Sequence, residues 1–234
     1  AVIPRPEIAK GFLMMATRKG LIKKTPLAEF DSIRKVGKIA ISLNEGDSLI
    51  SVQMTCGYDE ILVASNDGKC IRFSEEDVRP MGRDTQGVKS MNLNKDDYIV
   101  DMIVLKNGFE VMTMSEQGYG KRTEIEEFRL QSRAGKGIKA GVINEKTGKL
   151  VALKLVSADN DVMVIADNGI IIRIKAEEIS KIGRDTQGVR IMKLKDSGKV
   201  VSVAVTPSEP EEPEEGAAES AETPEGETKP ATEE

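Results

Sequence analysis

The feature that most constrains the fold of this chain is an internal repeat of about fifty residues. The heptapeptide Gly-Arg-Asp-Thr-Gln-Gly-Val occurs twice, at 82–88 and 183–189, two periods apart. Glycines mark this turn in register in all four copies, as Gly37, Gly87, Gly137 and Gly188. A second glycine series marks another turn, at Gly20, Gly68, Gly118 and Gly169. The chain is therefore expected to consist of four similar supersecondary units.

Each repeat is predicted to contain about four short strands, because no repeat holds a helix-length periodic segment. Nearly continuous apolar runs before the second glycine series are typical of strands buried on both faces, and they cover 12–16, 61–64, 111–114 and 162–166. We expect the second strands to end near Phe30, Val78, Phe128 and Ile179. We expect the third strands to carry Leu43, Leu93, Ile143 and Leu194. The fourth strands are expected to run to Val52, Met102, Leu153 and Val203.

Four strands in roughly fifty residues is the size of one blade of a β-propeller. The predicted fold class is therefore all-β and propeller-like, with about four four-stranded blades. The predicted domain covers 1–206, with repeats at about 8–52, 58–102, 108–153 and 159–203. The chain contains no tryptophan, so the Trp-Asp motif of WD-repeat propellers is absent.

Charge is distributed unevenly along the chain. Residues 207–234 contain eleven glutamates and one lysine, with no aromatic or large aliphatic side chain, and we expect them to form a disordered acidic tail. Residues 1–206 then carry a net charge of +5. The tail is interpreted either as a solubility device or as a competitor for the surface that a polyanion would occupy.

Composition excludes several classes of function. The chain has no histidine, which removes imidazole bases, Ser-His and Cys-His nucleophile pairs and histidine metal sites. Cys56 and Cys70 are too few for a four-thiolate zinc site or a disulfide framework, which favours a reducing cytoplasm. No apolar run approaches the roughly 20 residues that span a bilayer, so we expect a soluble protein without a membrane partner. We predict no catalytic residue, no metal site and no cofactor in this chain.

Two sets of basic residues recur with the repeat. Lys24, Arg72, Arg122 and Arg173 each lie four residues after a glycine of the second series, and we expect them to form structural ion pairs with Glu29, Asp77, Glu127 and Glu178. The second set lies in the loops around the Gly37 series and is expected to line one outer rim as a continuous basic stripe. This predicted DNA-binding set comprises Arg34, Lys35, Lys38, Arg79, Arg83, Lys89, Arg129, Arg133, Lys136, Lys139, Lys181, Arg184 and Arg190.

A periodic basic stripe fits a periodic polyanion. Lysine and arginine at loop tips neutralise the phosphates of a curved DNA duplex without contacting any base. Aromatic residues make up 3% of the chain, which argues against single-strand binding by base stacking. Two alternatives remain at this point: a solvated surface with Gly- and Arg-rich turns, and a propeller that acts as a protein–protein scaffold.

Several runs of sequence together resemble the C-terminal domain of bacterial DNA gyrase A. These runs are 23–30 (KKTPLAEF), 46–50 (GDSLI), 78–83 (VRPMGR), 118–123 (GYGKRT) and 182–189 (IGRDTQGV), and the resemblance covers nearly all of 8–206. It implies a β-pinwheel, a propeller variant in which neighbouring blades exchange strands. It also implies that the domain binds duplex DNA and bends it round a basic rim, in support of ATP-dependent negative supercoiling.

The resemblance has two departures. The family motif Gln-Arg-Arg-Gly-Gly-Lys-Gly lies in the first blade, whereas the nearest match here is 131–137 (QSRAGKG), in the second-to-last repeat, with Ser132 and Ala134 replacing an arginine and a glycine. A complete domain of the family has six blades, so we expect two blades, including that motif, upstream of Ala1. Residues 131–137 are interpreted as the repeat equivalent of the motif.

The resemblance also implies the partners. They are double-stranded DNA, the rest of gyrase A, and gyrase B in an A2B2 assembly in the bacterial cytoplasm, associated with the nucleoid. The ATPase, the magnesium site and the DNA-cleaving tyrosine belong to other parts of that assembly. The related C-terminal domain of topoisomerase IV, with a role in decatenation and relaxation, is the nearest alternative.

Overall fold

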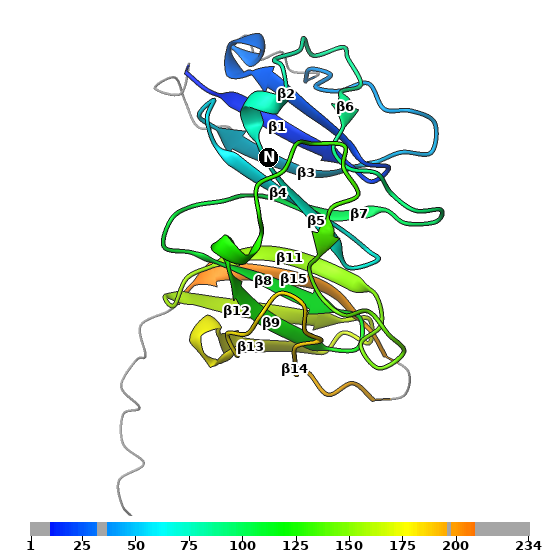
Figure 1. Ribbon diagram of the computed structural model, residues 1–234, viewed down its shortest axis with the longest axis vertical. Coiled ribbons are helices and arrows are strands. Elements are labelled where there is room, and N and C mark those ends of the chain that lie inside the picture. Colours follow the sequence, from blue (N-terminus) through cyan, green and yellow to red (C-terminus); the bar gives the residue numbers. More distant parts are fainter. Residues whose placement is uncertain (1–9, 32–36, 196–197, 209–234) are drawn as a thin grey trace, which may run out of the picture.

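The computed structural model describes residues 10–31, 37–195 and 198–208. Within them the strands form three four-stranded sheets and one three-stranded sheet, stacked along the long axis of the molecule (Figure 1). This confirms the predicted all-β, propeller-like class. No helix in these residues is long and apolar enough to cross a membrane. The predicted tail falls outside the described residues from 209 onward, as do Arg34 and Lys35.

The four sheets share one antiparallel plan. The first, ordered β3-β1-β2-β6, contains β1 (Phe12–Thr17), β2 (Leu21–Pro26), β3 (Leu49–Thr55) and β6 (Val88–Lys89). The second, ordered β10-β5-β4-β7, contains β4 (Glu60–Ser65), β5 (Lys69–Ser74), β7 (Ile99–Val104) and β10 (Ile138–Lys139). The third, ordered β11-β8-β9-β14, contains β8 (Glu110–Ser115), β9 (Tyr119–Glu124), β11 (Leu150–Val156) and β14 (Val189–Arg190). The last, ordered β13-β12-β15, contains β12 (Asn160–Ala166), β13 (Ile171–Lys175) and β15 (Val200–Pro207).

Each four-stranded sheet is completed by a strand from the following repeat. The short strand β6 belongs to the second repeat but pairs with β2 of the first, and β10 and β14 pair in the same way with β5 and β9. This exchange is the one that the family resemblance implies. The last sheet has three strands within the described residues, all of them from the fourth repeat.

The third strands differ from the prediction. In the last three repeats they contain two residues each and follow directly after Gly87, Gly137 and Gly188, whereas Leu93, Ile143 and Leu194 lie beyond them in loops. In the first repeat Leu43 lies in a loop, and the described residues 37–48 form no strand. Leu93 and Ile143 still contribute to the core, because each packs on the hairpin turn of the preceding repeat. A Cβ placed on Gly20 or Gly68 would lie within 3.0 Å of these side chains. The apolar pattern was therefore correct for burial and wrong for the strand position.

The second strands also end earlier than predicted. A single 3₁₀ turn follows each of them before the positions expected for the strand end, namely η2 (Leu27–Phe30), η3 (Glu75–Asp77), η4 (Ile125–Glu127) and η5 (Ala176–Glu178). In three of the four turns the residue after the turn donates its N–H to the first residue of the turn, as Val78 does to Glu75 at 3.0 Å. The turns also expose carbonyl groups that side chains of the neighbouring sheet contact.

The apolar runs are continuous because each strand serves two cores. Alternate residues of β4 point to opposite sides: Ile61 and Val63 pack against the first sheet, and Leu62 and Ala64 pack against the third. In β8, Val111 packs toward the second sheet, whereas Met112 and Met114 pack toward the fourth. A strand buried on both faces needs an apolar residue at every position. The prediction of four doubly buried strands is confirmed for β1, β4 and β8, and it is wrong for β12, in which Met163 and Ile165 are only partly buried.

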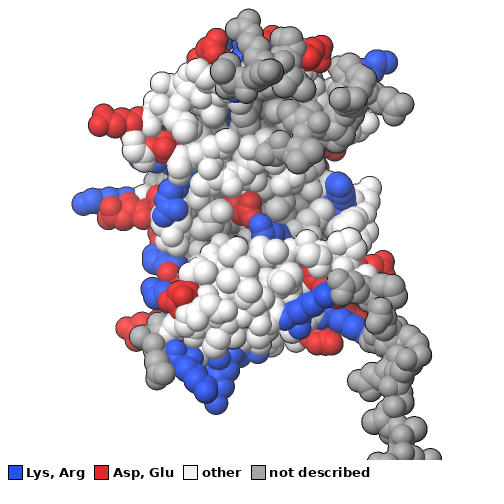
Figure 2. Space-filling model, turned by 180° about the vertical axis from the view of Figure 1, so that it is seen from behind, with Lys and Arg blue, Asp and Glu red and all other residues white. Residues whose placement is uncertain are grey.

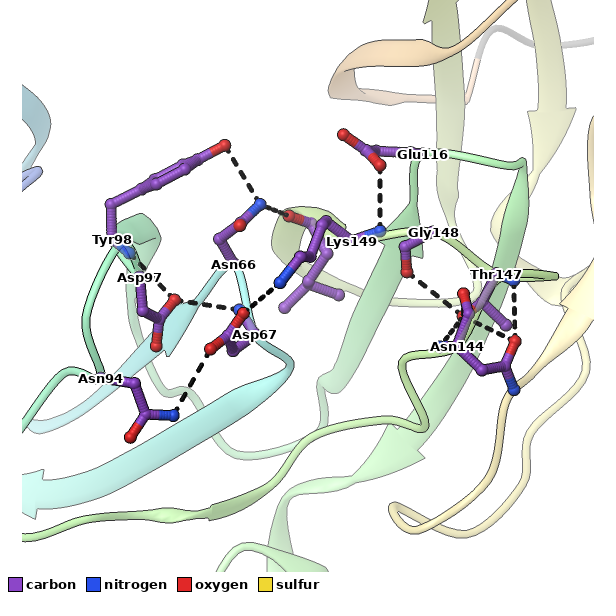
Figure 3. Close-up of polar contacts among 11 residues, drawn as sticks. Asn66, Asp67, Asn94, Asp97, Tyr98, Glu116, Asn144, Thr147, Gly148 and Lys149 are labelled. Carbon is purple, nitrogen blue, oxygen red and sulfur yellow. Dashed lines mark hydrogen bonds and ion pairs between the residues drawn. The ribbon is translucent and has the colours of Figure 1, made fainter. Parts of the chain in front are cut away.

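Polar contacts fix the spacing of the second and third sheets at their hairpin turns (Figure 3). Lys149, the residue before β11, forms an ion pair with Asp67 in the turn between β4 and β5. The Asn66 side chain donates to the Tyr98 hydroxyl at 3.1 Å and to the Leu150 carbonyl at 3.2 Å. At the other two junctions the repeat equivalents of Lys149 are Tyr98 and Lys199: the Arg18 guanidinium lies 3.5 Å from the Tyr98 ring centre, and Lys199 pairs with Glu116 at 3.4 Å. The residue before β7, β11 and β15 thus contacts the preceding sheet at each junction, through an ion pair at two junctions and a cation–π contact at the third.

Candidate nucleic-acid interface

The loops that carry the predicted DNA-binding residues are joined in series by backbone hydrogen bonds. Each of the first three loops donates an N–H to the loop of the next repeat, with donor and acceptor in equivalent positions. The three bonds run from Ser42 to Thr85 at 3.1 Å, from Asn92 to Gly135 at 2.8 Å and from Val142 to Thr186 at 3.2 Å. The four loops therefore form one continuous chain of contacts along the molecule, and we call this chain the loop ladder.

Three arginines of the loop ladder hold adjacent loops together. Arg83, Arg133 and Arg184 are repeat equivalents and are half-buried. Each guanidinium donates to a carbonyl of the preceding loop, namely that of Ile39 at 3.3 Å, Lys89 at 3.1 Å and Lys139 at 2.7 Å. Their charge thus lies in the ladder, and part of their hydrogen-bonding capacity is used within the protein.

The other cations differ in exposure. Lys38 is half-buried and donates to the Glu29 carbonyl at 3.2 Å. Two exposed lysines form ion pairs: Lys139 with Asp185 at 3.5 Å, and Lys181 with Glu124 at 2.7 Å and Glu110 at 3.0 Å. The remaining members of the predicted set are exposed, namely Arg79, Lys89, Arg129, Lys136 and Arg190.

The face opposite that of Figure 1 carries its charged side chains mainly at its margins. Figure 2 shows basic and acidic side chains along the edges of this face and around its lower end, with few of either in its middle. On this face the charged groups therefore concentrate at the margins.

The strand cations have the structural role that we predicted, but with other partners. Arg72, Arg122 and Arg173 pair with acids twelve residues earlier, Glu60, Glu110 and Asp161, with a nitrogen–oxygen distance of 2.7 Å in each pair. Lys24 pairs with Glu75 at 2.8 Å. The prediction of Glu29, Asp77, Glu127 and Glu178 as partners was wrong. The hairpin register explains the difference, because Arg72 lies directly opposite Leu62 and so beside Glu60 on the same face.

These strand cations also tie each sheet to the 3₁₀ turn of the next. The Arg72 guanidinium donates to the carbonyls of Ile125 and Phe128 at 2.9 and 3.0 Å. The Arg122 guanidinium donates to those of Ile179 and Glu177 at 2.8 and 2.9 Å. Each arginine therefore binds carbonyl groups of the following turn, and the Ile125 carbonyl also accepts the N–H of Phe128 at 3.0 Å.

Two buried lysines beneath the loop ladder were missed by the sequence reasoning. Lys23 is 0% exposed and Lys121 is 2% exposed. Lys121 Nζ donates to the carbonyls of Gly183, Arg184 and Thr186 at 3.0, 2.5 and 2.8 Å. Lys23 Nζ donates in the same way to Arg83, to Thr85 at 3.1 Å and to Ala40 at 2.7 Å. Each ammonium group thus binds the inner side of one Gly-Arg-Asp-Thr-Gln-Gly loop.

The two identical heptapeptides coincide with these two lysines. Both copies lie over a buried lysine, whereas the divergent loop 131–137 lies over Ile71, the repeat equivalent of Lys23 and Lys121. A Cβ on Gly135 would be 3.4 Å from Ile71. The sequence signal was present: lysine alternates with isoleucine three residues after Gly20, Gly68, Gly118 and Gly169, and lysine occurs where the following loop has the heptapeptide sequence.

Burial sets the electrostatics of these two groups. Desolvation lowers the pKa of Lys121 to about 8, against the raising influence of Glu127 and Asp185. Desolvation also lowers the pKa of Lys23, which Asp84 partly opposes. At neutral pH the Lys121 ammonium group is mostly protonated and donates to loop carbonyls.

Stacked four-stranded sheets, exchanged strands and a loop ladder at one edge together define a β-pinwheel repeat protein. The family described as "DNA gyrase C-terminal domain, beta-propeller" matches 11–56, 59–106, 110–157 and 160–207. These four segments cover most of the chain. The chain belongs to the DNA gyrase C-terminal domain family.

Curated relatives and solved structures agree with this assignment. The chain is 40% identical over 204 residues to DNA gyrase A of Ureaplasma parvum and 42% identical over 205 residues to that of Staphylococcus epidermidis, covering 87% of this chain in both cases. It spans 24% and 23% of the length of these two relatives. A solved gyrase A C-terminal domain superposes with a TM-score of 0.76 at 27% identity, covering 86% of this chain and 67% of that one. The C-terminal domain of DNA topoisomerase IV shares the fold, with a TM-score of 0.81 at 24% identity, covering 88% of this chain and 64% of that one.

Proposed function

We propose that this chain binds duplex DNA without sequence preference and bends it along the loop ladder. The observation that carries the proposal is the set of loop-to-loop hydrogen bonds, which places repeated cation-bearing loops in one continuous series. Exposed Arg79, Arg129 and Lys136 lie in these loops, and exposed Lys89 and Arg190 lie in the short strands that follow them, where Lys89 donates to Asn92 at 3.2 Å and Arg190 to the Tyr119 hydroxyl at 2.8 Å. Phosphate contacts of this kind give affinity and orientation without base specificity.

Arg34 and Lys35 belong to the same proposed set and are assigned to it by their position in the repeat alone. Repeated contacts matter for bending, because deforming a duplex costs on the order of a few kcal/mol and must be offset by contacts distributed along the protein.

Family membership extends the proposal to the whole protein. In it the domain supports ATP-dependent negative supercoiling by presenting a bent DNA segment to the rest of gyrase A and to gyrase B, in an A2B2 assembly in the bacterial cytoplasm. ATP and magnesium are used in other parts of that assembly, and this chain supplies binding without catalysis. The names of the curated relatives, at 40–42% identity, favour gyrase over topoisomerase IV.

The test is a salt titration of duplex binding by the 234-residue chain. Binding by phosphate neutralisation predicts that log affinity falls linearly with log salt, with a slope of about −0.9 for each phosphate contacted. A random-sequence duplex and a second duplex of different composition are expected to give the same slope. A flat salt response, or no binding to duplex at low salt, would favour the protein–protein scaffold.

A further inference from the structure

The peptide geometry around the buried lysines has a consequence for the outer side of the loops. All described peptide bonds are trans, so the N–H of each residue points away from the carbonyl of the residue before it. Lys121 draws the carbonyls of Arg184 and Thr186 inward, which turns the N–H groups of Asp185 and Gln187 outward. The side chains of Asp185 and Gln187 are exposed, so this part of the backbone lies at the surface.

The same geometry occurs in the first copy of the heptapeptide. Lys23 draws the carbonyls of Arg83 and Thr85 inward, which turns the N–H groups of Asp84 and Gln86 outward. Both of these residues are exposed. The two loops thus present equivalent pairs of backbone donors, separated by two repeats.

A carboxylate bound at one of these loops provides an independent observation. Lys121 also draws the Gly183 carbonyl inward, and the outward N–H of Arg184 donates to Oε2 of Glu127 at 2.7 Å. The glutamate comes from the turn η4 of the preceding repeat. The loop backbone therefore already holds one anionic oxygen on the side that faces away from the lysine.

We infer that Lys23 and Lys121 are positioning residues that turn the backbone N–H groups of Asp84, Gln86, Asp185 and Gln187 outward as contacts for phosphate oxygens of the duplex. The inference rests on the proposed function, and it assigns phosphate recognition to backbone amides as well as to exposed cations. The buried ammonium groups act through the loop backbone and do not touch the DNA. Successive N–H groups that point to one side are a known form of anion site.

Asp84 and Asp185 lie in these loops, and their negative charges repel phosphate. Asp185 forms an ion pair with Lys139 at 3.5 Å, which neutralises part of its repulsion toward phosphate. Asp84 and Asp185 also lie near the buried ammonium groups, which favours the protonated lysines. The arrangement therefore keeps an inner cation and outer donors on opposite sides of one backbone.

The test compares the 234-residue chain with Lys121→Met, in which an apolar side chain of similar length replaces the ammonium group. Three quantities are measured: duplex affinity, its salt slope, and the amide NMR signals of the loop during titration with a short duplex. Lys193→Met removes the same charge at an exposed position and serves as the control.

Loss of one or two backbone hydrogen bonds predicts duplex binding about three- to tenfold weaker for Lys121→Met. Its salt slope is expected to remain unchanged, because no counterion is released at a buried group. The amide signals of Asp185 and Gln187 are expected to shift on titration in the unmodified chain and not in Lys121→Met. The amide of Val142, which donates to the Thr186 carbonyl, should exchange faster in the variant.

A second variant separates positioning from folding. It combines Lys121→Ile with Gly183→Ser, Asp185→Ala, Thr186→Gly and Gln187→Lys, which copies the natural pairing of Ile71 with 132–137. We expect this variant to fold and to recover slow Val142 exchange, which is its readout, because Asp185→Ala and Gln187→Lys change the surface charge and so alter duplex affinity independently of the loop geometry. If Lys121→Met does not fold, this variant alone decides, and its failure to fold would count against the inference.

Other results would overturn the inference. One is a Lys121→Met variant whose duplex affinity and Val142 amide exchange equal those of the unmodified chain. The other is a Lys121→Met variant whose salt slope falls in magnitude by as much as after loss of an exposed cation. If the unmodified chain fails to bind duplex, the proposed function fails instead. The Val142 exchange comparison still tests the positioning role in that case.

Discussion

The backbone N–H of Arg184 donates a 2.7 Å hydrogen bond to the carboxylate of Glu127 in the preceding repeat. An acid thus occupies a donor of the loop ladder, at the surface proposed for the phosphate backbone. Because carboxylate and phosphate oxygens accept the same hydrogen bonds, Glu127 is placed to compete with DNA.

Glu127→Gln is therefore expected to tighten duplex binding, by weakening this contact and removing one negative charge. Glu126→Gln is the matched control, since it removes the same charge from an exposed neighbour in η4. We expect Glu127→Gln to raise affinity about threefold more than its control, a factor typical of one modest hydrogen-bond difference. Fluorescence anisotropy with a labelled duplex measures both, and equal gains would show that only net charge matters.

Arg122→Met should destabilise the chain without changing the salt slope of DNA binding. It breaks the pair with Glu110 and leaves the carbonyls of Ile179 and Glu177 without their donor. We expect a loss of about 2–3 kcal/mol in the free energy of unfolding, measured by urea denaturation. Adding Glu110→Met should recover part of this loss, and a double variant as unstable as the sum of the single variants would contradict the pairing.

Arg129→Gln and Lys136→Gln should each act on DNA binding and hardly on stability. Both side chains are exposed, and both lie in the loop ladder. Each substitution is expected to reduce the magnitude of the salt slope by about 0.9 and to change the unfolding free energy by less than about 0.5 kcal/mol. The slope of Arg122→Met provides the reference, and an equal reduction there would remove the distinction between strand and loop cations.

The stability contributed through Lys121 should depend on pH in a defined direction. The pKa of Lys121 is about 8 in the folded chain, and its ordinary value of 10.5 applies to the unfolded chain. Between pH 8 and pH 10.5 the unfolded chain therefore holds a proton that the folded chain has lost. Stability therefore rises with pH in this window, by at most about 1.4 kcal/mol per pH unit from this group. The difference in unfolding free energy between the unmodified chain and Lys121→Met, measured from about pH 7.5 to about pH 9.5, is expected to increase, and a flat or falling difference would be inconsistent with the lowered pKa.

Gly137→Ala should be far more damaging than Gly108→Ala, although both glycines have positive φ. A Cβ on Gly137 (φ +69°) would meet the Cys70 carbonyl oxygen at 2.4 Å, whereas nothing lies within 4 Å of a Cβ on Gly108 (φ +82°). We expect a loss of more than about 2 kcal/mol for Gly137→Ala and of about 1 kcal/mol for Gly108→Ala. Thermal denaturation of the two variants decides, and similar melting temperatures would mean that the backbone at Gly137 moves freely.

The repeat and its doubly buried strands were predictable because they follow from local sequence. A run such as 61–64 must be apolar at every position when both sides of the strand face a core, and the glycines mark turns that need positive φ. The third strands were not predictable in the same way. Their pairing with the preceding repeat depends on contacts that no alternation within two residues can encode.

The candidate site was predictable in its location and less so in its chemistry. The spacing of Arg83, Arg133 and Arg184 places them in equivalent loops, but their bonds to loop carbonyls depend on how neighbouring repeats meet. The same limit explains the wrong acids for Arg72 and Arg122, because the partner follows from hairpin register and not from distance along the chain. Whether the predicted cations contact DNA remains a prediction.

Because each four-stranded sheet takes its last strand from the following repeat, one repeat of the sequence does not correspond to one complete sheet. A truncation between repeats, near residue 107, leaves the second sheet without β10 and its outer edge unpaired. A truncation just after β10 preserves that sheet but carries part of the next repeat with it. Such an array therefore keeps complete sheets on shortening or lengthening only when the boundaries are shifted by most of a repeat. A duplicated repeat supplies its short strand to the sheet of the preceding repeat.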